Sequence, residues 1–297
     1  MNNKYEFTGE TQQVSGVTFQ RIRRAADKVV GGWLENEANL TVSGAAWVSG
    51  TAQVSGAARV SGAARVSGAA RVSGAARVFG TARVSGDAWV SGAARVFGAA
   101  RVSGDARVSG TAQVSGDAWV FGNARVFGDA RVFGDAWVSG AARVFGAARV
   151  FGAARVSGTA QVSGTAQVSG AAQVSGDARV SGDARVSGDA RVFGTAQVFG
   201  TAQVFGDAWV SGDARVFGAA RVSSPLICAS RSDGYLFVVA QCADKIVRVL
   251  VGCHYFTLGE ARAYWQQERG GTRLGDESLA LVDHLERMAQ FAGWLPS

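Results

Sequence analysis

The chain has 297 residues with 41 glycines, two prolines, three cysteines and a formal net charge of +7. Three widely spaced cysteines favour reduced thiols over a disulfide framework, and without an apolar run of 18 residues no membrane span is predicted. The amino terminus lacks the apolar core of a signal peptide, so we expect a cytoplasmic protein. The positive charge belongs to residues 41–222, which contain 18 arginines against ten aspartates.

Residues 1–40 are predicted to form an N-terminal cap for the repeats that follow. A stack of β-strands leaves unpaired backbone groups at each end, and such edges promote aggregation unless they are covered. We expect Val30, Trp33 and Leu34 to close the apolar interior at this end.

Residues 41–223 repeat a six-residue pattern and are predicted to form a stacked β-structure. Valine recurs at every sixth position from Val42 to Val222, 31 times without a gap, and 30 glycines follow two positions later. Within each repeat, a stretch such as Ala-Arg-Val-Ser alternates small, long, apolar and polar residues, which is the period of a β-strand. Glycine and the next residue, often aspartate, favour a turn. A single repeat cannot bury its own valine and alanine, so the repeats must stack.

Residues 224–297 are predicted to form a small α+β domain. The pattern indicates a β-hairpin from 234–242 and 245–252, followed by helices at 258–268 and 276–292. The residues of the second helix that we expect to face the core are Leu281, Leu285, Met288 and Phe291.

The repeats and their flanking segments resemble a known family. RIR at residues 21–23, GGWLE at 31–35, NL at 39–40 and RVLVGCHYFTLGEARAYW at 248–265 are similar to segments of YdcK-type hexapeptide-repeat proteins of phage and prophage genomes. The resemblance implies a mainly β fold: a left-handed parallel β-helix, shaped as a triangular prism of about ten coils, with an N-terminal cap and a small C-terminal α+β domain. It also implies phage or prophage association and side-by-side homo-oligomers, for which a trimer is the form expected.

With three repeats per coil, the outward residues before each valine fall on three faces, and four of the five repeat tryptophans share one face. Exposed aromatic patches often mark partner contacts, and arginines beside aromatic rings suit phosphates and bases. The alternative is that arginine and glutamine only keep the stack soluble. The residues predicted to form an interaction surface are Trp119, Phe121, Trp137, Arg125, Phe127, Arg143 and Phe145.

The repeats lack the side chains that catalysis requires. Acyltransferases with a left-handed β-helix use a histidine as general base, but no histidine precedes His254. Cys253 and His254 are neighbours on one predicted strand, so their side chains point to opposite faces, and no C-x-x-C spacing indicates zinc. We therefore expect no catalytic residue, cofactor or metal, and interpret the chain as a non-enzymatic rigid scaffold or binding rod.

The expected partners of this scaffold are proteins or polyanions, and the C-terminal domain is a second candidate for a protein contact. Two alternatives stay open, an acyltransferase-like enzyme and a nucleic-acid-binding protein. No membrane contact is predicted.

Overall fold

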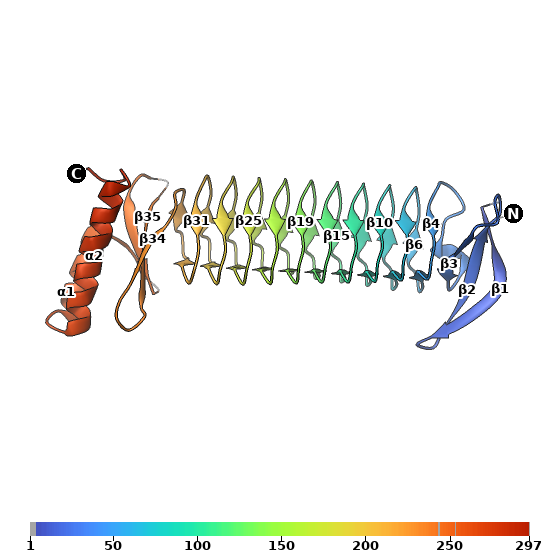
Figure 1. The fold of residues 1–297 in the computed structure, drawn as a ribbon, viewed down its shortest axis with the longest axis horizontal. Coiled ribbons are helices and arrows are strands. Elements are labelled where there is room, and N and C mark those ends of the chain that lie inside the picture. The colour runs from blue at the N-terminus through green and yellow to red at the C-terminus, as the bar shows by residue number, and fades with distance from the viewer. Residues whose placement is uncertain (1–3, 243, 253, 297) are drawn as a thin grey trace. The chain divides into compact units, whose positions relative to one another are not determined.

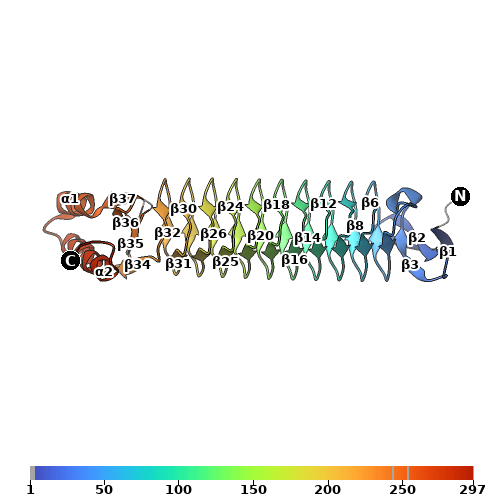
Figure 2. The same ribbon diagram turned by 90° about the horizontal axis from the view of Figure 1, so that it is seen from above.

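The computed structural model describes residues 4–242, 244–252 and 254–296, and its fold is mainly β (Figures 1 and 2). It is a parallel β-solenoid of about 11 turns with a small C-terminal domain of two helices and an antiparallel sheet, which confirms the predicted fold class. The left-handed sense of the coil stays a prediction. The chain divides into two compact units, residues 1–159 and residues 160–297.

The first unit begins with an antiparallel hairpin of strands β1 (Tyr5–Val14) and β2 (Val17–Arg24), which continues into β3 (Val30–Leu34). Trp33 and Leu34 are buried as predicted, and they pair in parallel with the first coil. Val30 is 49% exposed, so its predicted place in the core was wrong. It pairs with Arg23 of the hairpin, before β3 reaches the coil, and Ile22 fills the interior instead.

The Gly-Gly pair before Trp33 allows β3 to lie directly against the first coil. A Cβ on Gly32 would lie 2.7 Å from both the Ala52 carbonyl oxygen and the Val48 side chain. A 3-10 helix, η1 (Glu37–Asn39), follows. The buried Asn39 amide donates hydrogen bonds to the carbonyls of Gly56 and Ala58 at 3.0 and 2.9 Å. These bonds cover the end of the stack, because they satisfy acceptors that no preceding coil can reach.

Two-residue strands separated by glycine corners build the solenoid part of the first unit. Each strand pairs in parallel with the strand 18 residues away, as Arg83 does with Arg65 and Arg101, so a coil contains three repeats. The strands are β4 (Trp47–Val48), β5 (Gln53–Val54), β6 (Arg59–Val60), β7 (Arg65–Val66), β8 (Arg71–Val72), β9 (Arg77–Val78), β10 (Arg83–Val84), β11 (Trp89–Val90), β12 (Arg95–Val96), β13 (Arg101–Val102), β14 (Arg107–Val108), β15 (Gln113–Val114), β16 (Trp119–Val120), β17 (Arg125–Val126), β18 (Arg131–Val132), β19 (Trp137–Val138), β20 (Arg143–Val144), β21 (Arg149–Val150) and β22 (Arg155–Val156).

These strands form three parallel sheets, one on each face of the coil. Within the first unit the sheets run β3-β5-β8-β11-β14-β17-β20, β4-β7-β10-β13-β16-β19-β22 and β6-β9-β12-β15-β18-β21. The names sheet A, sheet C and sheet B are used for them in that order. The alanine and valine of every strand point inward and are fully buried from Ala46 and Val48 onward. Val42 is 57% exposed, because it precedes the first strand of the coil, so its predicted inward position was wrong.

The corner glycines adopt a conformation that other residues rarely reach. Gly104 has φ of +66°, and a Cβ there would lie 3.0 Å from the backbone nitrogen of Gly122 in the next coil. Glycine therefore has two physical reasons to recur: the turn needs a positive φ, and stacked corners approach too closely for a side chain.

The second unit continues the same pattern and ends in the C-terminal domain. Its solenoid sheets are β23-β26-β29-β32, β25-β28-β31 and β24-β27-β30-β33. Their strands are β23 (Gln161–Val162), β24 (Gln167–Val168), β25 (Gln173–Val174), β26 (Arg179–Val180), β27 (Arg185–Val186), β28 (Arg191–Val192), β29 (Gln197–Val198), β30 (Gln203–Val204), β31 (Trp209–Val210), β32 (Arg215–Val216) and β33 (Arg221–Val222).

The C-terminal domain packs two helices on one face of a four-stranded antiparallel sheet. The core includes Phe237, Val249, Trp265 and Leu285. Its elements are β34 (Ile227–Ser230), β35 (Leu236–Gln241), β36 (Val247–Val251), β37 (His254–Thr257), α1 (Leu258–Arg269) and α2 (Arg273–Phe291).

The side of α2 that enters the core differs in part from the prediction. Leu285 is buried as expected, but Met288 and Phe291 are 36% and 85% exposed, so their predicted core positions were wrong. The buried stripe runs instead through Val282, Leu285 and Ala289, because the sheet receives that side of the helix.

The opposite face of this sheet covers the last coils of the second unit. Val238, Ala240 and Leu250 are buried there, and Val222 of the last repeat forms an antiparallel bridge with Cys242. The exposed edge that a strand stack would otherwise present is thus closed within this unit.

Candidate binding surface

The predicted aromatic patch is present in the first unit. The Trp119 and Trp137 rings meet edge to face at 5.5 Å between centroids, and Phe121 lies 4.9 Å from Trp119 and 6.2 Å from Trp137. Trp137 is 38% exposed. Arginines one coil away cover the two ends of this cluster, with Arg101 over Trp119 at 5.7 Å and Arg155 over Trp137 at 5.1 Å. Such cation–π contacts hold the indoles against the sheet and leave part of their edges accessible.

The other four predicted residues form a separate group on the neighbouring face. Phe127 and Phe145 stack in parallel with centroids 5.0 Å apart, and Arg125 pairs with Arg143 along sheet A. Phe121 follows a strand of sheet C and Phe127 follows a strand of sheet A, so the two groups lie at different corners of the coil. The structure therefore brings the seven residues together as two clusters, and their role in binding stays a prediction.

The arginines of the first unit's repeats point into solvent without acidic partners. No arginine between residues 41 and 158, all of them described, forms an ion pair. Neighbouring arginines in one sheet are separated by one strand spacing, about 4.8 Å. Two unit charges at that distance repel by about 0.9 kcal/mol in water. A bound anionic polymer would relieve this repulsion for every pair that it spans.

One edge of the first unit has arginines on both sides and no acidic residue between them. Residues 38–86 contain no Asp or Glu. The edge continues with strands β12 and β13, and the corner residues two positions before Arg95 and Arg101 are Ala93 and Ala99. We call it the acid-free edge; its residues are Arg59, Arg77 and Arg95 on sheet B and Arg65, Arg83 and Arg101 on sheet C.

The acid-free edge was not predicted from the sequence, although a signal for it was present. That signal was the absence of aspartate from consecutive corners, a feature less conspicuous than the tryptophans. Phe79 and Phe97 lie at the corner between the two rows of arginine, and their rings stack at 4.9 Å between centroids with planes 2° apart. A groove of about 290 Å³ adjoins them, lined by Thr41, Arg59, Ser61, Arg77 and Phe79.

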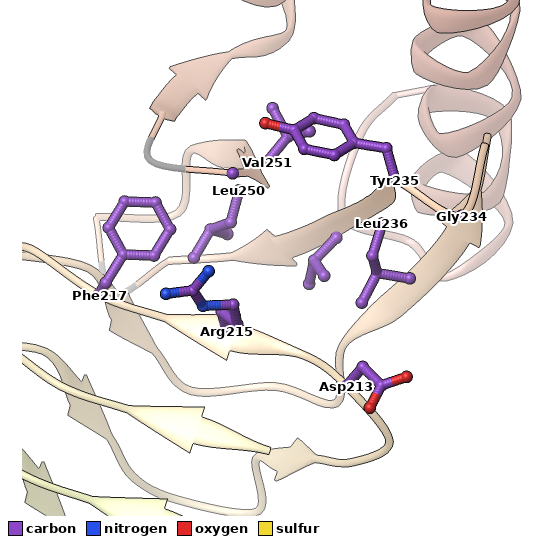
Figure 3. Close-up of a pocket in the computed structure, with 10 residues that line it drawn as sticks. Asp213, Arg215, Phe217, Gly234, Tyr235, Leu236, Leu250 and Val251 are labelled. Carbon is purple, nitrogen blue, oxygen red and sulfur yellow. The ribbon is translucent and has the colours of Figure 1, made fainter. Parts of the chain in front are cut away.

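A cavity also lies in the second unit, where the last coils meet the C-terminal sheet (Figure 3). Phe217 and Leu250 provide apolar walls, and Arg215 enters from the solenoid side. Its volume is about 150 Å³, below the roughly 300–1,000 Å³ of typical small-molecule sites. Gly252 makes room for the Tyr235 hydroxyl, with which a Cβ at this position would clash. We interpret this cavity as a packing gap between the last coils and the C-terminal sheet.

Cys242 and His254 of the C-terminal domain make structural contacts. Cys242 is buried with its sulfur 3.1 Å from the Tyr255 hydroxyl. Burial is the main cause that raises the pKa of Tyr255, to about 12, so the phenol is neutral at physiological pH. The His254 ring stacks on Phe256 at 4.9 Å and contacts Tyr264 at 4.5 Å. Cys253, its predicted neighbour, lies outside the described residues.

The chain is thus a parallel β-solenoid whose six-residue repeats direct arginine and aromatic side chains outward. The family model described as YdcK Beta solenoid repeat matches residues 52–68, 124–140 and 172–186, so these three segments are similar to YdcK β-solenoid repeats. A search of curated proteins gives no match. Among the described residues, no helix has the length and apolarity needed to cross a membrane, and no three His, Cys, Asp or Glu side chains are grouped to hold a metal ion.

Proposed function

We propose that this protein is a non-enzymatic scaffold that binds anionic polymers through its arginine ladders. The observation that carries the proposal is the row of solvent-exposed guanidinium groups in strand register, without carboxylate partners, along the first unit. A solenoid suits this role, because its backbone hydrogen bonds fix the spacing of the charges and little conformational entropy remains to be lost on binding.

The residue types of the repeats support a binding role over catalysis. A general base must titrate near neutral pH within reach of its substrate, and the repeats have no histidine. The acyltransferase-like alternative would need a base from outside the repeats, and the His254 ring packs against the rings of Phe256 and Tyr264. Phage or prophage association and a cytoplasmic location stay predictions from the resemblance and from the amino-terminal sequence.

The experiment that tests the proposal is a titration of labelled single-stranded DNA and labelled inorganic polyphosphate with the full chain, followed by fluorescence anisotropy. We expect saturable binding of both polymers at low salt and weaker binding as salt rises, because condensed counterions are released on binding. The absence of binding to either polymer at low salt would reject the proposal.

A second role is favoured for the Trp119–Phe121–Trp137 cluster, because it is the largest group of contacting aromatic rings that the solenoid of the first unit displays. We propose that it contacts another protein surface, with a second copy of this chain as the simplest partner. Sedimentation equilibrium of the wild type and of Trp137→Arg tests this role. The sheet accepts arginine in this column, because Arg155 occupies the position one coil after Trp137. A monomeric wild type would reject self-association.

A further inference from the structure

The groove beside Phe79 lies at the N-terminal end of a stacked pair of aromatic rings, Phe79 and Phe97. In the corner column of this edge, Phe97 and Phe79 stack, and the next position one coil towards the N-terminus is Ser61. Phe79 thus has one ring face on Phe97, and no ring of the described residues contacts its other face. The groove of about 290 Å³ lies there, bordered by Ser61 and Phe79.

The shape of this space suits one planar ring. The rings of Phe79 and Phe97 are parallel within 2° and their centroids are 4.9 Å apart, so a phenylalanine at position 61 would stack on Phe79 in the same way. Because serine leaves that place open, a ligand ring can take it. Base–aromatic stacking of this kind contributes substantially to single-strand binding and accepts any base, since every base has a flat π-face.

The charges around the groove favour an anion beside that ring. Arg59 and Arg77 line it, and both are exposed and lack an ion-pair partner among the described residues. Lys4 lies close by, with its ammonium group 2.7 Å from the carbonyl oxygen of Thr41. Beyond the groove, Arg95 continues the same row at strand spacing. A ligand with one planar ring and one negative charge per residue matches this arrangement.

We propose that the Phe79 groove is a stacking site for a base of single-stranded nucleic acid, whose phosphates lie along Arg59, Arg77 and Arg95. This inference rests on the proposed function and deepens it, because it separates a polymer with bases from a polymer with charge alone. The ring of one base stacks on the free face of Phe79. The adjoining phosphates follow the guanidinium row, where no corner aspartate opposes them.

Two substitutions at the groove test the proposal by opposite means. Phe79→Ser removes the stacking surface, and this column already accepts serine at Ser61 and Ser115. Ser61→Phe fills the groove with a further stacked ring and keeps the stack intact. We expect each variant to bind single-stranded DNA about tenfold more weakly than the wild type and to bind inorganic polyphosphate with unchanged affinity.

The matched control is Phe133→Ser, which removes one ring of a similar stacked pair, Phe133 and Phe151, in the same corner column as Phe79. Asp135 follows Phe133 at that corner and opposes phosphates, so the affinity for DNA should not change. The double variant Arg59→Gln/Arg77→Gln should weaken both polymers, because it removes charge without changing the rings; glutamine occupies the same column at Gln113.

The outcomes distinguish a failure of the stacking site from a failure of the arginine proposal. Suppose that the wild type binds both DNA and polyphosphate. If Phe79→Ser then loses equal affinity for both polymers, or if neither groove variant loses affinity for DNA, the stacking site is overturned and the arginine proposal stands. A wild type that binds neither polymer would overturn both. Melting curves of each variant identify any loss of affinity that is due to unfolding.

Discussion

The solenoid repeats and the C-terminal domain are stabilised in different ways. In the repeats, one Val and one Ala per strand are buried, and each strand meets neighbours of the same kind on both sides. In the C-terminal domain, single large side chains make contacts that occur once, as Trp265 does with Phe237 and Tyr264. The difference shows that stability in the repeats is distributed over equivalent positions, whereas in the domain it depends on a few unique residues.

The largest effect is expected for Trp265→Ala in the C-terminal domain. The indole is buried among Phe237, Tyr264 and the Arg231 guanidinium, and its loss should lower the free energy of unfolding by about 3–5 kcal/mol. Denaturant titration followed by helical circular dichroism measures this, because both α-helices belong to the domain.

Trp265→Phe is the control for this variant. The Trp265 Nε1 has no hydrogen-bond partner in the described part of the chain, so phenylalanine retains most of the packing and loses no hydrogen bond. If Trp265→Phe lowered the free energy of unfolding as much as Trp265→Ala, the packing of the indole against Phe237 and Tyr264 would not be what stabilises the domain.

In the repeats, we expect the largest single effect at a corner glycine. Gly104→Ala places a Cβ at a φ of +66° and 3.0 Å from the backbone nitrogen of Gly122. The left-handed conformation alone costs an L-residue about 1–2 kcal/mol, so the melting temperature should fall. Asp105→Ala, at the next position, is the control, since alanine occupies this corner column at Ala69 and Ala141. Equal melting temperatures for both variants would contradict the role assigned to glycine.

The C-terminal domain should also respond to acid through Asp233. The Arg231 guanidinium is buried and bonded to this carboxylate at 2.8 and 3.0 Å, which lowers the pKa of Asp233 to about 2. A carboxyl pKa below the ordinary value of about 3.9 stabilises the folded state fully above about pH 4, and this stabilisation is lost as pH falls towards 2. Asp233→Asn should reduce stability at neutral pH and flatten the decline between pH 4 and 2, as measured by denaturant titration at each pH. An unchanged pH profile would rule out this pair as the cause.

The smallest effect is expected for deletion of a whole coil. Residues 55–72 are three identical hexapeptides. After their removal, residues 73–90 supply the same backbone acceptors to Asn39 that Gly56 and Ala58 supply now. Cooperative unfolding should persist, with the melting temperature changed by a few degrees at most. If the deletion abolished cooperative unfolding, the repeats would not be equivalent in the way that their sequence indicates.

The sequence alone predicted the features that depend on the six-residue period of the repeats. It did not predict which side chains are buried where one element packs against another. Strict spacing of valine and glycine was enough for the strands, the corners and the three faces, since each follows from backbone geometry. Val30, Met288 and Phe291 were placed in the core because apolar spacing does not tell which side of an element meets a partner. The Phe79 groove was missed for a similar reason: it depends on Thr41, Ser61 and Phe79, which come together only once the coils are in register.

The salt dependence of DNA affinity shows whether the acid-free edge binds anionic polymers through its unpaired arginines. The variant to compare with the wild type replaces Arg59, Arg65, Arg77, Arg83, Arg95 and Arg101 with glutamine. Each phosphate contact on single-stranded DNA contributes about 0.7 to the slope of log affinity against log salt. We expect the slope to fall by about 2–4 in this variant while its melting temperature stays within a few degrees of the wild type. An unchanged slope in a folded variant would contradict it.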